Sequence, residues 1–240
     1  MRLIACLLAT VLYAQSPAFE AAAIRLNANP GPQMTFGPEL RNGRVTASNV
    51  TLKRMLAVAY GMTEPRVFGP GWLEKDHFDL AGTSPRGVPE NQLKPMLQTL
   101  LQDRFKLTAH LETREMPVYF LVIAKGGVKM AVYPKPERPL EGPAYRGFPQ
   151  LRGSGTTSDI ADRMTFFVNQ PVIDKTGLKE RYNFFLTYAP LSPQGDNNPE
   201  FGPPDIFTAI QKQMGLKLEA GKDNVEVVVV DHMEQQPTEN

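Results

Sequence analysis

Cysteine is almost absent from this sequence, since Cys6 is the only one among 240 residues. It lies in the apolar segment at the amino terminus, so a mature chain that has lost this segment contains no thiol. That excludes a disulfide framework and thiol chemistry. The fold must be stabilised by burial, and the chain is long enough for one large domain or two small ones.

Long hydrophobic runs are also missing. The apolar stretch 3–13, preceded by Met1 and Arg2, is too short to span a bilayer and is typical of a secretory signal. We therefore predict a signal peptide over residues 1–15, with Ala14/Gln15 as the preferred cleavage point. No later segment has the apolar length of a membrane span, so we expect export to the periplasm or the exterior without membrane insertion after signal removal.

Neither positive nor negative charge predominates in the sequence. The chain has 26 Lys plus Arg and 25 Asp plus Glu, with no long run of either sign, and loss of Arg2 with the signal balances them. This argues against nucleic acid and anionic membrane surfaces as partners. The partner that we expect is an envelope protein.

Catalytic motifs are missing as well. The three histidines, His77, His110 and His232, are not paired at the spacing of metal ligands, and there is no nucleophile elbow or phosphate loop. The run 174–177, Asp-Lys-Thr-Gly, resembles the phosphorylated-aspartate motif of transport ATPases and part of the penicillin-recognising signature. The membrane helices of the former and the Ser-x-x-Lys of the latter are absent, so we interpret the run as a structural turn. We predict no catalytic residue, no metal site and no cofactor.

Apolar spacing predicts helices starting near Leu52, Leu93, Ile160 and Ile206. Their expected N-caps and C-terminal stops come from short polar residues and from glycine: Thr51, Thr156 and Asp205 for the former, Gly61 and Gly215 for the latter. Pro95 falls inside the second pattern, so a helix that starts near Glu90 should kink there.

Alternating apolar residues predict strands. Two antiparallel hairpins are expected, 105–113 with 118–124 and 216–220 with 225–231, and further strands at 44–48, 78–83, 172–174 and 182–188. The aromatic residues in these strands and on the helix stripes are expected in the core: Tyr119, Phe120, Phe166, Phe167, Phe184 and Phe185.

The order of these elements repeats along the chain. The segment from Thr51 to Leu73 aligns without a gap to the segment from Thr156 to Leu178, and Phe105 to Leu107 matches Leu216 to Leu218. A rival register pairs 46–50 with 156–160 but breaks the helix phase. The sequence thus predicts an α+β fold made by tandem duplication of a small unit of helices and antiparallel strands.

This organisation gives the expected domain boundaries. The first unit covers 16–132, a Pro/Gly-rich linker 133–150, the second unit 151–233 with a loop at 190–204, and a tail 234–240.

Several motifs closely resemble the uncharacterised "soil-associated" exported-protein family of soil bacteria, a domain of unknown function. They are Phe-Glu-Ala-Ala-Ala-Ile at 19–24, Gly-Pro-Gly-Trp at 69–72, the segments 96–107 and 171–178, and Val-Val-Asp-His at 229–232. The resemblance implies an exported protein of unknown activity, sometimes appended to a membrane metallopeptidase, and it transfers no catalytic residue. The helix-strand units also resemble, at fold level, the short N-terminal modules of secretins and TonB-dependent receptors, which are protein-interaction domains.

These features favour an exported binding or interaction module without catalytic activity. The expected contact residues lie in two turns that the alignment places opposite one another, Gly71 and Trp72 in one, Lys175 and Thr176 in the other. Exposed tryptophans anchor interfaces. Two alternatives stay open: an exported enzyme whose site is assembled from His and carboxylates of both units, and a sensor domain associated with a membrane peptidase.

Overall fold

The structure is a computed structural model of the whole chain, and it describes residues 16–31, 38–134, 148–189 and 202–238. These residues form two compact units. Unit 1 contains residues up to 61, 70–109 and 230 onward, and unit 2 contains 62–69 and 110–229. The predicted signal peptide 1–15 and most of the predicted linker and of the loop 190–204 lie outside the described residues.

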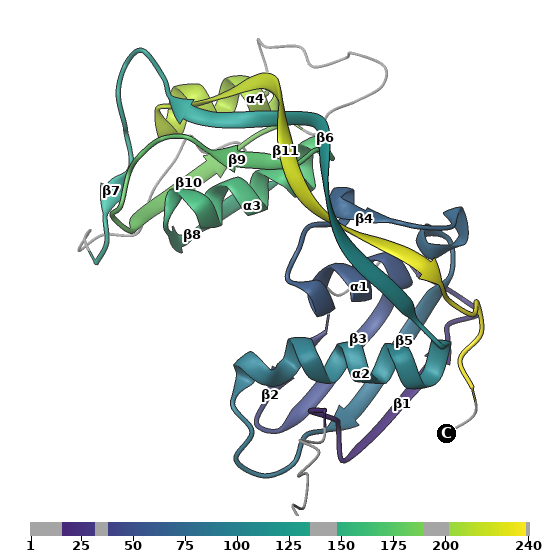
Figure 1. Ribbon diagram of the computed structural model, residues 1–240. Coiled ribbons are helices and arrows are strands. Elements are labelled where there is room, and N and C mark those ends of the chain that lie inside the picture. The colour runs from purple at the N-terminus through teal and green to yellow at the C-terminus, as the bar shows by residue number, and fades with distance from the viewer. Residues whose placement is uncertain (1–15, 32–37, 135–147, 190–201, 239–240) are drawn as a thin grey trace, which may run out of the picture. The chain divides into compact units, whose positions relative to one another are not determined.

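A four-stranded antiparallel sheet forms the base of unit 1 (Figure 1). Its strands, in spatial order, are β1 (Ala21–Leu26), β5 (His77–Thr83), β3 (Arg44–Thr51) and β2 (Glu39–Arg41). Asn42 and Gly43 join β2 to β3 with φ of 50° and 73°, as a tight hairpin turn requires. Alternate residues of the strands, among them Ile24, Val45 and Phe78, are buried on the face that carries the helices.

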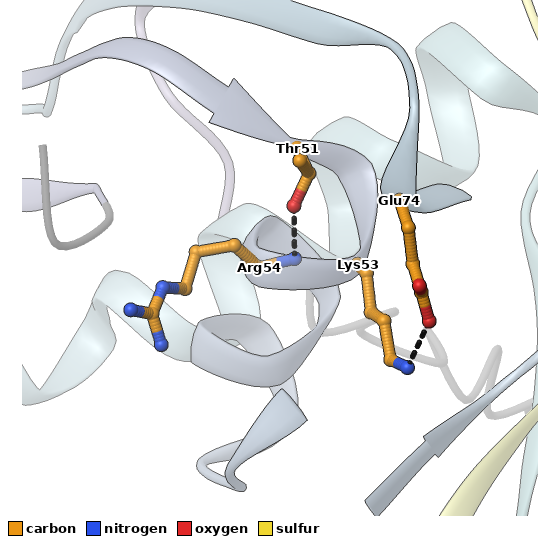
Figure 2. Close-up of polar contacts among 4 residues, drawn as sticks. All are labelled: Thr51, Lys53, Arg54 and Glu74. Carbon is orange, nitrogen blue, oxygen red and sulfur yellow. Dashed lines mark hydrogen bonds and ion pairs between the residues drawn. The ribbon is translucent and has the colours of Figure 1, made fainter. Parts of the chain in front are cut away.

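Two helices cover that face, α1 (Leu52–Tyr60) and α2 (Leu93–Phe105). Thr51 caps α1 by accepting a hydrogen bond from the Arg54 backbone N–H at 3.2 Å (Figure 2), and Gly61 ends the helix at φ 66°. Both predicted caps are confirmed. They were predictable because a cap depends on residues within one turn of the helix end.

The kink at Pro95 was predicted for a helix that starts near Glu90, and α2 does not meet that condition. A short 3-10 turn, η3 (Glu90–Gln92), precedes α2, and the α-helix begins only at Leu93. Pro95 therefore lies in the first helical turn, where a backbone N–H has no intrahelical partner and its loss does not bend the helix.

Unit 2 contains two sheets. A small antiparallel one has the order β7 (Ala131–Val132), β10 (Tyr182–Thr187), β8 (Gln150–Gly155). The other has the order β4 (Val67–Phe68), β11 (Leu216–His232), β6 (Thr108–Ile123), β9 (Val172–Asp174). In this second sheet β4 pairs in parallel with β11, and β9 pairs in parallel with β6.

The helices of unit 2 begin at their predicted caps. Thr156 caps α3 (Thr157–Val168) in a reciprocal capping box with Asp159, and Asp205 caps α4 (Ile206–Ala209), which continues as a π-helical turn, η4 (Ile210–Met214). Gly215 ends this turn at φ 71°. One apolar core joins the helices to the strands, and it includes Leu121, Ile160, Phe184, Leu186, Ile210 and Met214.

Both predicted hairpins are wrong, because β6 and β11 are each one continuous strand of 16 and 17 residues. A tight hairpin needs residues at positive φ, and none of the residues in the expected turns 115–117 and 221–224 has one. Gly221 instead makes room for Phe120, since a Cβ at this position would lie 2.3 Å from the Phe120 ring. This glycine allows two neighbouring strands to pack closely. In the sequence, such a glycine resembles the glycine of a turn.

The α+β class is confirmed by this architecture. The order strand, helix, short strand, strand, helix, long strand occurs from β3 to β6 and again from β8 to β11. The duplication itself stays a prediction. The compact units differ from the contiguous segments 16–132 and 151–233, because the two long strands each contribute residues to both units.

The expectation that all six aromatic residues are core residues holds only in part. Phe184 is 1% exposed, whereas Phe166 on α3 is 53% exposed and stacks its edge against Phe167. The helical spacing that predicted α3 places Phe166 two positions after the buried Met164, on the opposite side of the helix.

Candidate interaction site

The predicted contact residues lie in two separate units. Gly71 and Trp72 belong to a 3-10 turn of unit 1, η2 (Gly71–Glu74), whereas Lys175 and Thr176 follow β9 in unit 2. Each turn is therefore described by itself.

Hydrogen bonds, a buried side chain and an ion pair hold the Trp72 turn in place. The Trp72 carbonyl accepts hydrogen bonds from the backbone N–H groups of Lys75 at 3.0 Å and Asp76 at 3.3 Å, and buried Leu73 anchors the turn to the core. Lys53 of α1 forms an ion pair with Glu74 (Figure 2), with an N–O distance of 2.5 Å. These contacts present Trp72 half-buried on a fixed backbone.

A further hydrogen bond joins this turn to the C-terminal segment of unit 1. The Gln235 side-chain amide donates to the Asp76 carboxylate at 2.6 Å. The backbone N–H of Glu234 donates to the Phe105 carbonyl at 2.7 Å, which holds the same segment against the end of α2. The C-terminal segment therefore connects the Trp72 turn to the end of α2 within unit 1.

In unit 2, the Asp174 carboxylate organises a cluster of hydroxyl groups. One oxygen accepts from Thr157 at 2.6 Å and from Ser158 at 3.1 Å, and the other accepts from the Thr176 hydroxyl at 2.7 Å and its backbone N–H at 2.9 Å. Burial raises the pKa of Asp174, but the hydrogen bonds from Thr157, Thr176 and Ser158 outweigh it, so the pKa lies below its ordinary value.

The cluster is a structural turn, as the sequence indicated for residues 174–177. The Thr176 hydroxyl oxygen also lies 3.0 Å from the Thr157 hydroxyl oxygen, and Gly177 has φ 71°. Thr176 is thus half-buried, with its hydroxyl turned toward Asp174. Lys175 points to the surface, where its ammonium lies 3.5 Å from the Asp223 carboxylate and 5.6 Å from the centre of the Phe120 ring.

Replacing Asp174 by asparagine should lower the free energy of unfolding by about 1–3 kcal/mol at pH 7, because an amide accepts fewer of these bonds than a carboxylate. The pKa of Asp174 is depressed in the folded state, so its contribution is present above the unfolded pKa of about 4 and disappears as the pH falls through the folded pKa. The gap between wild type and Asp174→Asn in urea unfolding should therefore shrink from pH 7 toward pH 2.

The matched control is Asp103→Asn, since Asp103 is an exposed carboxylate on α2. It should change stability by less than about 0.5 kcal/mol at either pH. A gap for Asp174→Asn that is equal at pH 7 and pH 2 would show that the carboxylate charge adds nothing to this turn.

Two hollows that sequence reasoning missed flank β1 in unit 1. One has about 450 Å³ on the sheet face opposite the helices, and its lining residues come from three strands: Ala21, Ala23, Arg44, Thr46, Ala81 and Thr83. The other has about 150 Å³ and lies between residues 18–22 and the α2 residues Thr99, Leu100, Asp103 and Arg104. No local pattern marks them, because each is formed by residues far apart in the sequence.

The histidines lie in different surroundings. His77 is half-buried with its Nδ1 3.0 Å from the Lys75 carbonyl, and His110 is exposed with its Nε2 3.5 Å from the Glu112 carboxylate. Among the residues that the structure describes, no three His, Cys, Asp or Glu side chains converge as metal ligands do. In the same part of the chain no helix is long and apolar enough to cross a membrane.

Comparison with protein families finds one match, to the model described as "Protein of unknown function (DUF3738)", over residues 53–233. The match covers more than half of the 240 residues. The chain belongs to this family. No curated protein and no solved structure matches the chain.

The DUF3738 region includes the Trp72 turn and the Asp174 cluster. It begins at the second residue of α1, so β1, β2 and β3 precede it. Of the strands that line the larger hollow, only β5 lies inside the DUF3738 match.

Proposed function

We propose that this chain is an exported binding module of the cell envelope that contacts a protein partner through the Trp72 turn. The observation that carries the proposal is the braced turn itself. Its backbone is held by hydrogen bonds and by the Lys53–Glu74 ion pair, while Trp72 itself is half-buried.

Such a turn suits binding for two physical reasons. An indole contributes a large apolar area and an N–H donor, and tryptophan is enriched among the residues that dominate interface energies. A backbone that is already ordered pays little conformational entropy on association. The signal-like segment 1–15 and the resemblance to the soil-associated exported family support the location, and the resemblance to secretin and TonB-type modules supports a protein partner.

The test is site-specific photocrosslinking in the native envelope. A photoreactive amino acid at Lys75, which is exposed next to the Trp72 turn, should capture one reproducible protein that mass spectrometry can identify. The same amino acid at Lys217 of unit 2 serves as the control position, because its side chain is 50% exposed. Capture of the same set of proteins from both positions would contradict the proposal.

Trp72→Ala should weaken binding of the purified partner by at least tenfold, as measured by calorimetry, since truncating an interface anchor costs about 2 kcal/mol or more. Tyr133→Ala is a matched control, because Tyr133 is an aromatic residue that is 49% exposed in unit 2. Trp72→Phe keeps a ring in the turn and should lose less affinity than Trp72→Ala. Equal affinities for wild type and Trp72→Ala, with the fold intact by circular dichroism, would place the contact elsewhere.

A further inference from the structure

The edge strand β1 lacks the features that normally protect a sheet edge. It is the outermost strand of its sheet, and no described strand pairs with its outer side. Its sequence is Ala-Ala-Ala-Ile-Arg-Leu, with one charge and no proline. Natural edge strands usually carry several charges, proline or a bulge, because unpaired N–H and C=O groups invite another strand.

The long strands of unit 2 show what protection looks like in this chain. Each is paired on one outer side over only a few residues, β6 with β9 and β11 with β4. Along the remaining length β6 carries Glu112, Arg114 and Pro117. β11 has a charge at nearly every second position between 217 and 226. By this contrast, the outer side of β1 is open to pairing.

The backbone of β1 shows which residues face outward. The N–H of Asn27 donates to the His77 carbonyl at 2.8 Å, in register with the β1–β5 ladder. Odd-numbered residues of β1 therefore bond to β5, since the ladder alternates with a period of two. The N–H and C=O groups of Ala22, Ile24 and Leu26 point to the open edge.

We propose that the occupant of this edge is β1 of a second copy of the chain, paired antiparallel about a twofold axis at Ile24. A twofold axis perpendicular to the sheet gives an antiparallel pair in which each residue meets a residue on the same face. With the axis at Ile24, Ala22 lies opposite the second copy's Leu26, and Ala23 lies opposite the second copy's Arg25. Each long side chain meets an alanine, and the two arginines do not face each other.

The helix-side hollow fits this register. Leu26 is 47% exposed, which leaves an apolar side chain in water at the end of β1. The hollow of about 150 Å³ lies between residues 18–22 and the α2 residues Thr99, Leu100, Asp103 and Arg104, so its lining is partly apolar and partly charged. The second copy's Leu26, directly opposite Ala22 and on the same face, would lie at the end of the hollow that Ala22 forms, and the contact would be made twice.

The hollow on the other face fits as well. This hollow has a volume of about 450 Å³. It lies over Ala21, Ala23 and Ala81, next to the position of the second copy's Arg25. The aliphatic part of an arginine side chain covers alanine surface while its guanidinium stays in water. The chain is thus self-complementary on both faces of β1, as a symmetric pair of identical surfaces requires.

The expected dimer is weak and reversible. A pair of six-residue strands with these side chains buries less than the roughly 1,200 Å² of a stable interface, so we expect dissociation in the micromolar range or above. The proposal does not rest on the partner of the Trp72 turn, because it concerns a different surface.

Sedimentation of the exported chain over a range of concentrations tests the proposal. The wild type should shift from monomer to dimer as concentration rises. Ala23→Arg places an arginine opposite the second copy's Arg25 at two symmetric points, and the dissociation constant should rise at least tenfold. The double variant Ala23→Arg with Arg25→Glu makes both contacts oppositely charged and should return the constant to within threefold of wild type.

Thr108→Arg is the matched control, because Thr108 is exposed in unit 1 and lines neither hollow. It adds the same charge and should leave the dimer unchanged. A wild type that stays monomeric at millimolar concentration would overturn the proposal, even if it bound a foreign extended peptide. A dimer insensitive to Ala23→Arg, or one that the second charge change does not restore, would overturn it too.

Discussion

Replacing Gly215 by alanine is expected to lower the free energy of unfolding by about 4 kcal/mol or more, which is an exceptional loss for one added methyl group. Gly215 has φ 71°, a backbone conformation that residues with a Cβ rarely adopt. The added Cβ would also lie 2.0 Å from the Gly127 carbonyl oxygen and 2.9 Å from the Lys129 backbone N. Both contacts are with backbone, so no side-chain rotation can relieve them.

The segment around Gly215 has further reasons to resist movement. The Gly215 carbonyl accepts from the Ala124 N–H at 2.9 Å, and the Met214 carbonyl accepts from the Lys129 N–H at 3.0 Å. A shift that relieved the clash would lengthen these hydrogen bonds, which hold the end of η4 against the turn after β6.

Gly177→Ala separates the cost of the positive φ from the cost of the clash with backbone atoms. Gly177 also has φ 71°, but a Cβ there would meet nothing within 4 Å. It should cost only the backbone conformation, about 1–2 kcal/mol. Urea unfolding followed by far-ultraviolet circular dichroism measures both variants. Equal losses would show that the close approach at Gly127 is not maintained in solution.

Replacing Phe105 by alanine is expected to cost about 3–5 kcal/mol, because it removes a large ring from a closed core. Phe105 is 0% exposed at the end of α2, and its ring stands edge-on to Phe78, also 0% exposed, with 5.4 Å between centroids. The loss therefore combines the buried area, the cavity left behind and a favourable aromatic pair.

Trp72 gives a specific readout for this variant, because it is the only tryptophan of the chain and belongs to the same unit as Phe105. Its fluorescence should report a lower urea midpoint for Phe105→Ala. Phe166→Ala in unit 2, followed by far-ultraviolet circular dichroism, is the control of the same residue type, since Phe166 is 53% exposed, and it should cost less than about 1.5 kcal/mol. A Phe105→Ala loss no larger than that of Phe166→Ala would contradict the packing seen around α2.

The contrast between Phe105 and Phe166 also shows where sequence reasoning ends. Helical spacing was enough to place α2 and α3, and counted from Met164 it also places Phe166 on the other side of α3, but the prediction grouped Phe166 with the apolar stripe. A stripe of apolar residues indicates a face only to within one or two positions, and the neighbours that cover that face are remote in the chain. The same limit applies to Gly221, where close packing on Phe120 resembled a turn.

The candidate sites also combine features that the sequence predicts with contacts that it does not predict. The residues of both turns could be named in advance, because proline, glycine and tryptophan in close sequence mark a turn with an aromatic group. The two hydrogen bonds from Thr176 to Asp174 are local, since these residues are two positions apart. The Lys53–Glu74 ion pair and the hydrogen bonds from Thr157 and Ser158 to Asp174 join residues that are 16 or more positions apart. They could not be derived from spacing.

By itself, the sequence determined the α+β class, the caps Thr51, Thr156 and Asp205, and the stops at Gly61 and Gly215, because each depends on side chains and backbone within a few residues. Tertiary structure alone decided that β6 and β11 are continuous strands, that β4 and β9 pair with them, and that β1 is an open edge with a hollow on each face. Strand pairing joins residues far apart in the chain, and its stability comes from neighbours that no local pattern identifies.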